Sequence, residues 1–238
     1  RAQPLIDYRR ITALKRKVTE PMLAYLRSSS SARRESFEKF VAARPALQDY
    51  AAFRAKTERE RKIWWHWPEP DRGGALTGGG YDESAKLYHL YVQWLCNEQI
   101  SRLSGEQDRS SAALYLDFPL GVNRDSYDVW RYRDLFALDA SGGAPPDGLF
   151  IKGQDWGFPP QHPGTVRRQG YRYYRECLRH HMAHASMLRI DHVMGLHRAF
   201  WVPDGFSAAE GLYVHQRAEE YYAVLSLESH RHRVQIVG

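Results

Sequence analysis

An apolar run passes into charged residues at Met187-Leu188-Arg189-Ile190-Asp191-His192-Val193-Met194-Gly195-Leu196. This order is typical of a buried β-strand that ends by presenting polar side chains to a site. Arg189 and Asp191 are two residues apart, so on a strand their side chains point to the same face. An isolated Arg-x-Asp pair is usually a surface ion pair. The aromatic residues Phe200 and Trp201 just beyond it favour a pocket for a polar substrate.

Two other stretches have the same character. Residues 112–122 run apolar into Asp117 before a Pro/Gly turn, and residues 233–238 begin a third apolar run. Helical spacing predicts helices at 170–186 and from about 212 to 227, between successive strands. Repeated strands and helices, with polar residues at the carboxyl ends of the strands, predict an α/β fold. The specific architecture predicted is a partial (β/α)₈ (TIM) barrel with helical insertions.

The two ends of the chain differ in pattern. Residues 1–62 predict helices, one of them restarting at Thr19-Glu20-Pro21, and form a helical subdomain or a barrel insertion. Residues 63–238 are assigned to the partial catalytic barrel. Near its start, three Trp lie in the run Ile63-Trp64-Trp65-His66-Trp67-Pro68-Glu69-Pro70. They form either a hydrophobic plug or a wall that faces a sugar. A long Gly/Pro-rich loop at 142–160 is typical of a lid.

Composition excludes several classes of protein. The 238 residues are 43% hydrophobic and 26% charged, which is ordinary for a globular protein. The net charge is +6, but acidic residues are interleaved with the basic ones, so no nucleic-acid partner is indicated. Neither a signal peptide nor a membrane-spanning run is found in the sequence. Cys96 and Cys177 are far apart, and both are expected to be reduced and buried, as in a cytoplasmic enzyme.

The candidate chemistry is that of carboxylates. The sequence contains no G-x-S-x-G, no H-E-x-x-H and no phosphate-binding loop. His180, His181 and His184 have a spacing that could bind zinc, but they precede the strand and are expected to face solvent, so no metal site is predicted. Asp117 and Asp191, among aromatic, amide and Arg side chains, point to carbohydrate. Hydrolysis or transfer of glycosides needs a pair of carboxyl groups that flank the bond being broken.

Four motifs resemble those of the 4-α-glucanotransferases (amylomaltases or disproportionating enzymes) of the α-amylase clan. The first combines Leu116-Asp117-Phe118-Pro119-Leu120-Gly121-Val122 with Asp125-Ser126-Tyr127-Asp128-Val129-Trp130. The second combines Pro145-Pro146-Asp147 with Gly153-Gln154-Asp155-Trp156-Gly157. The third is Arg189-Ile190-Asp191-His192, and the fourth is the Trp64–Pro70 segment with Gln93-Trp94. Their order and spacing agree with the family from about residue 63 onward.

The resemblance implies a role for each matching residue. Asp191 matches the catalytic nucleophile, and Arg189 matches the Arg beside it, whose positive charge favours the anionic nucleophile. The positions that match substrate contacts are His192, Asp117, Asp147, Gln154 and Trp156. The chain departs from the family's pattern at Gly148 and Leu149, where an aromatic pair is common, and at Phe158, where Asn is usual.

The resemblance also implies a reaction, which is the retaining transfer of an α-1,4-glucan segment. Malto-oligosaccharides, maltose and glucose are the expected donors and acceptors, and no cofactor is needed. The family's acid/base Glu follows a strand like Val234-Gln235-Ile236-Val237-Gly238, so it is expected beyond residue 238. The 238 residues alone are therefore expected to be inactive. Two alternatives stay open, an α-glucan hydrolase of the same clan and a non-catalytic glucan-binding protein. The oligomeric state is not indicated.

Overall fold

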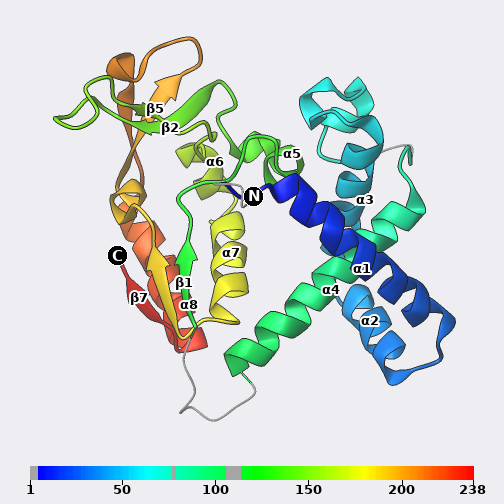
Figure 1. Ribbon diagram of the computed structural model, residues 1–238. Coiled ribbons are helices and arrows are strands. Elements are labelled where there is room, and N and C mark those ends of the chain that lie inside the picture. The colour runs from blue at the N-terminus through cyan, green and yellow to red at the C-terminus, as the bar shows by residue number, and fades with distance from the viewer. Residues whose placement is uncertain (1–4, 77–78, 106–113) are drawn as a thin grey trace. The chain divides into compact units, whose positions relative to one another are not determined.

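The computed structural model describes residues 5–76, 79–105 and 114–238. The chain forms two compact units (Figure 1). One contains the chain up to Trp67 together with Leu76–Gln99, and the other contains Pro68–Ala75 with Ile100–Gly238. The units differ from the predicted division at residue 62 because the helix after residue 82 packs with the amino-terminal helices.

The amino-terminal unit is helical. It is built from α1 (Tyr8–Ser28), α2 (Ala32–Ala42), α3 (Pro45–Glu60), the 3₁₀ turn η1 (Trp64–His66) and most of α4 (Glu83–Gly105). Apolar side chains at helical spacing form its core, among them Leu26, Phe37 and Trp94. The Ser31 side chain accepts a hydrogen bond from the backbone N–H of Arg34, which fixes the start of α2.

Two features of this unit resolve expectations from the sequence. Pro21 does not begin a new helix, because α1 continues through it. Burial of Leu23 and Leu26 in the core offsets the hydrogen bond that Pro21 cannot donate. Trp64 and Trp67 are buried, with 2% and 3% of their surface exposed, and Trp67 packs against Phe53 with ring centroids 5.2 Å apart. These two tryptophans therefore form a hydrophobic plug.

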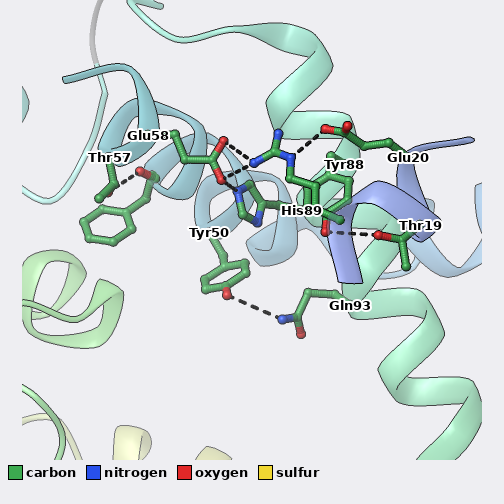
Figure 2. Close-up of polar contacts among 10 residues, drawn as sticks. Thr19, Glu20, Tyr50, Thr57, Glu58, Tyr88, His89 and Gln93 are labelled. Carbon is green, nitrogen blue, oxygen red and sulfur yellow. Dashed lines mark hydrogen bonds and ion pairs between the residues drawn. The ribbon is translucent and has the colours of Figure 1, made fainter. Parts of the chain in front are cut away.

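A polar network joins three helices of this unit (Figure 2). Arg16 on α1 donates hydrogen bonds from Nη1 to both carboxylate oxygens of Glu58 on α3, each at 2.8 Å. Arg16 Nε also donates to Glu20, and its guanidinium lies 4.4 Å from the ring centroid of Tyr88. His89 on α4 places Nε2 2.9 Å from Glu58 Oε1. The network replaces the water that these buried and half-buried groups would otherwise bind.

The network predicts that the helical unit loses stability in acid. Burial lowers the pKa of His89 below its ordinary 6.5, and the positive charges of Arg54 and Arg16 add to this effect, while Glu58 opposes it. The unfolded chain therefore binds a proton at His89 at a higher pH than the folded chain does. The contribution of His89 to stability is full above pH 6.5 and is lost as the pH falls through the folded pKa.

Thermal unfolding of the protein between pH 7.5 and 5 measures this effect. We expect Tm to fall with acidification, and His89→Gln to flatten that fall because Gln does not titrate. His66→Gln is the matched control, since His66 is exposed on the same unit. Parallel pH profiles for the wild type and His89→Gln would contradict the prediction.

The second unit contains a parallel sheet in the order β1-β4-β7 (Figure 1). The strands are β1 (Tyr115–Phe118), β4 (Met187–Ile190) and β7 (Gln235–Val237), where the sequence predicts them. Residues 112 and 113 of the first predicted strand lie outside the described residues. Leu188 and Ile190 are buried on one face of β4, so the alternation of the strand turns Arg189 to the other face.

Two helices cross over between the parallel strands. They are α7 (Arg172–Met182), before β4, and α8 (Ala218–His232), before β7. The helices pack together, and Glu228 of α8, fully buried, accepts hydrogen bonds at 2.9 Å from Nε and Nη2 of Arg179 on α7. These bonds hold the pKa of the Glu228 carboxyl below its usual value. The resulting βαβ connections make this part of the chain α/β.

A second, antiparallel sheet corrects two expectations. Its order is β3-β2-β5-β6, from β2 (Ala140–Ala144), β3 (Gln154–Asp155), β5 (Arg198–Pro203) and β6 (Leu212–His215). Part of the predicted loop at 142–160 is therefore strand, and residues 212–215 are strand rather than helix. Pairing with β5 stabilises both β2 and β6, and this partner is distant in sequence from β2.

Shorter elements complete the second unit. They are η2 (Glu69–Arg72), α5 (Tyr127–Arg131), η3 (Arg133–Leu135), α6 (Pro163–Arg168), η4 (Val193–Leu196) and η5 (Ala208–Glu210). In the described ranges, none of the helices combines the length and apolar character needed to cross a bilayer.

The cysteines are unpaired, but the expectation that both are buried is wrong for Cys96, which is exposed. Cys177 is half-buried. Burial raises the pKa of its thiol to about 11, which disfavours the reactive thiolate at neutral pH.

Candidate active site at the ends of the parallel strands

Arg189 lies between two carboxylates at the centre of the site. Its Nη1 donates hydrogen bonds to Oδ1 and Oδ2 of Asp117, at 2.9 and 2.8 Å, and its Nη2 donates to Oδ1 of Asp191 at 2.8 Å. The strand register explains the first contact, because Asp117 on β1 is the direct partner of Arg189 on β4. The two-residue spacing explains the second contact. The structure thus brings together three of the residues singled out in the sequence.

These three side chains are accessible and charged. The exposed fractions are 44% for Arg189, 61% for Asp117 and 43% for Asp191. Hydrogen bonds first to Asp117 and then to Asp191 raise the pKa of Arg189 above its ordinary value. A guanidinium is planar and presents several N–H groups in fixed directions, so it can orient two carboxylates at once. The arrangement offers a fixed cation and an accessible carboxylate oxygen to a ligand.

His192 extends the site beyond the end of β4. Its backbone is in the left-handed conformation, with φ of 50°, and the preceding Asp191 N–H donates to the carbonyl oxygen of Phe118 at 3.0 Å. The His192 ring meets the indole of Trp156 edge to face, with centroids 5.3 Å apart and planes at 79°. The chain therefore turns sharply after the carboxylate and places an aromatic pair beside it.

Gln154 and Trp156 reach the site from β3 and the residue after it. The Trp156 backbone N–H donates to the carbonyl oxygen of Gly142 at 2.9 Å, and its indole Nε1 donates to Gln154 Oε1 at 3.1 Å. Both residues belong to the lid motif in the sequence, and the structure brings Trp156 to His192. Trp156 and His192 thus form an aromatic wall beside Asp191, and its two residues come from segments far apart in the chain.

Phe158 takes part in this wall, although the sequence marked it only as a departure from the family's pattern. Its ring stacks on Trp156, with centroids 5.9 Å apart and planes at 21°. A Cβ atom added at Gly121 or Gly142 would lie 2.3 or 2.6 Å from the Phe158 ring. The two glycines indicate in the sequence that some group comes close to the backbone, but they do not identify that group as Phe158.

Within the described residues, Asp147 makes no hydrogen bond or ion pair with the other predicted site residues. It lies on the exposed turn after β2, and its Oδ1 accepts hydrogen bonds from the backbone N–H groups of Leu149 and Phe150 at 2.8 and 2.6 Å. This pattern is a local turn that orders the loop. Its role toward a substrate stays a prediction.

The three histidines before β4 differ in exposure. His180 is exposed as expected, whereas His181 and His184 are half-buried, and His181 Nδ1 lies 2.8 Å from the Cys177 carbonyl oxygen. Across the described part of the chain, no group of three or more His, Cys, Asp or Glu side chains is placed to hold a metal ion.

Comparison with known proteins agrees with these motifs. A family profile described as 4-alpha-glucanotransferase matches residues 1–238. The 4-alpha-glucanotransferase of Haemophilus influenzae is 33% identical over 261 residues, covering 100% of this chain and 37% of that protein. The Mycobacterium tuberculosis (strain H37Rv) 4-alpha-glucanotransferase is 33% identical over 199 residues, covering 81% and 28% respectively. The chain therefore spans little more than a third of the length of the first of these relatives and less of the second.

Two solved structures are similar to the chain. The crystal structure of amylomaltase from Corynebacterium glutamicum is similar with a TM-score of 0.72 and 32% identity, over 90% of this chain and 30% of that one. Amylomaltase from Streptococcus agalactiae, in complex with acarbose, has a TM-score of 0.84 at 21% identity. That likeness covers 97% of this chain and 49% of the other, and it shows a shared fold.

Proposed function

Because the chain belongs to the 4-alpha-glucanotransferase family, we propose that the whole protein transfers α-1,4-glucan segments between malto-oligosaccharides. The observation that carries this proposal is the bridge from Arg189 to Asp117 and Asp191, beside the aromatic pair of Trp156 and His192. A charged pair gives the polar contacts that sugar hydroxyls need, and aromatic faces pack on pyranose rings. Malto-oligosaccharides, maltose and glucose are the proposed donors and acceptors.

The proposed fold of the catalytic region is a partial (β/α)₈ barrel within residues 63–238, with the helical segment 1–62 preceding it and with Leu76–Gln99 packed in the helical unit. Parallel strands connected by helices, with charged side chains at their carboxyl ends, support this assignment. The strands of the antiparallel sheet lie in the chain between the parallel strands, and Trp156 directly follows β3.

The proposed reaction is a double displacement with retention. An Asp191 carboxylate oxygen attacks the anomeric carbon of the donor, the bond from that carbon to the glycosidic oxygen breaks, and a carboxylic acid protonates the leaving oxygen. The 4-hydroxyl of a second sugar then attacks the anomeric carbon of the glycosyl ester. Its proton passes to the carboxyl group that had protonated the leaving oxygen, and the bond from the anomeric carbon to Asp191 breaks. Transfer exceeds hydrolysis when the lid keeps water away from the ester.

Arg189 and Asp117 have separate proposed roles. Arg189 orients the Asp191 oxygen and keeps a positive charge beside it. Asp117 accepts two hydrogen bonds from Arg189 Nη1, so we assign it to holding Arg189 in place and to binding sugar hydroxyls. Gln154, Trp156, His192 and Asp147 are assigned to substrate contacts.

Incubation of the whole protein with maltotriose tests the function. We expect a ladder of shorter and longer oligosaccharides, because each transfer lengthens one molecule as it shortens another. Glucose and maltose alone would instead indicate an α-glucan hydrolase. Binding of maltotriose without any change in its length would indicate a non-catalytic glucan-binding protein.

A further inference from the structure

The Phe158 ring fills a space that two glycines leave open. Gly121 follows β1, and Gly142 lies in β2, so the ring touches the chain next to both sheets of this unit. A Cβ at Gly121 would come within 2.3 Å of Phe158 Cδ2, and one at Gly142 within 2.6 Å of Phe158 Cε2. The Phe158 carbonyl oxygen also accepts a hydrogen bond from the Gly142 N–H at 2.8 Å. Both the ring and the backbone of Phe158 are therefore fixed.

Three contacts of the Trp156 side chain define its orientation. One contact is the stack on Phe158, a second is the hydrogen bond from Nε1 to Gln154 Oε1, and a third is the edge-to-face contact with His192. Of these partners, His192 directly follows Asp191 and Gln154 is half-exposed. The Phe158 ring is the partner that packs against the backbone at both Gly121 and Gly142, so it links Trp156 to the segments after β1 and in β2.

We propose that Phe158 is a positioning residue that fixes the plane of Trp156 beside His192 and Asp191, and thereby sets the affinity of this wall for a glucose unit. The inference rests on the proposed function for its ligand, and on the packing alone for its geometry. Phe158 acts through Trp156, so its effect on binding should exist only while Trp156 is present.

A double-mutant cycle in the whole protein tests this dependence. Phe158→Leu removes the stacked ring, and loss of one aromatic pair corresponds to a rise in KM for maltotriose of about two- to twelvefold. We expect kcat to stay unchanged, because the lost contact is made in ground and transition states alike. In a Trp156→Ala background, Phe158→Leu should leave KM unchanged.

Two controls separate positioning from general packing. Phe158→Met, which keeps most of the volume but not the ring, should give the same rise in KM with less effect on Tm. Phe206→Leu, at a side chain that is 58% exposed on the same unit, should leave KM unchanged. An equal effect of Phe158→Leu with and without Trp156, or none with Trp156 present, would overturn the inference.

Near-UV circular dichroism keeps the test independent of activity. Phe158→Leu should change the tryptophan signal that Trp156→Ala removes, and should cause no change in the Trp156→Ala background. If the wild-type protein transfers no glucan, the proposed function fails and this measurement alone decides the positioning. If the protein is active but the spectra and KM are unaffected, the positioning fails while the function stands.

Discussion

Asp191→Asn is expected to lower kcat for transfer from maltotriose by at least about 10⁴-fold in the whole protein. The amide oxygen of Asn can still accept the hydrogen bond from Arg189 Nη2, so the local structure should persist. The amide cannot form the glycosyl ester, so the double displacement stops at its first bond. Product chromatography over long incubation measures the residual rate, and Tm measures whether the fold is retained.

The matched control for this prediction is Asp134→Asn. The Asp134 side chain is 92% exposed on the same unit. Its carboxylate lies 4.0 Å from Arg133 Nε, which makes a long and weak ion pair. This change should leave kcat within about twofold of wild type, as expected for a surface substitution. Transfer that survives Asp191→Asn would reject Asp191 as the nucleophile, whatever the outcome at Asp134.

The centre of the site could be predicted from the sequence because its geometry is local. Arg189 and Asp191 share a strand face by spacing alone, and that strand follows a helix at the predicted place. The position of Asp117 needs only one further step. Two apolar strands that each end in charged residues, when paired in parallel, bring those ends to the same edge.

The antiparallel sheet could not be predicted in the same way because its strands are stabilised by distant partners. Ala140–Ala144 reads Ala-Ser-Gly-Gly-Ala, a composition with low strand propensity, and it becomes a strand by pairing with Arg198–Pro203. Leu212–His215 pairs with the same strand, so α8 begins only at Ala218. The helical spacing of residues 212–227 is a local pattern, so it cannot show that residues 212–215 pair with a distant strand instead.

The aromatic wall could be predicted only in part. The motif around Trp156 identifies it as a site residue. Its contact with His192 joins two distant segments, and no spacing in the sequence predicts it. The fit of Phe158 against Gly121 and Gly142 is a tertiary contact. A glycine in a sequence indicates that some atom comes close or that the backbone is unusual, without naming which atom.

Arg189→Met is expected to lower kcat/KM for maltotriose by about 10²–10³-fold, the effect of removing one electrostatic group aimed at the reacting centre. Met has a similar length and no charge, so Asp117 and Asp191 lose their shared cation and the orientation it imposes. Arg189→Lys should restore only part of the loss. Its ammonium replaces the charge, but it lacks the planar fork that reaches Asp117 from Nη1 and Asp191 from Nη2.

Steady-state kinetics on the two variants, with Arg168→Met as the control, separate charge from geometry. Arg168 is exposed on α6, where it donates a hydrogen bond to Thr165, and its substitution should leave kcat/KM near wild type. Full activity in Arg189→Lys would mean that the positive charge alone suffices and the fork is dispensable. Full activity in Arg189→Met would remove Arg189 from the site altogether. We expect kcat/KM to be highest for the wild type, lower for Arg189→Lys and lowest for Arg189→Met. Lys removes the bridge between the two carboxylates, and Met removes both the bridge and the charge, so this order requires that both properties contribute.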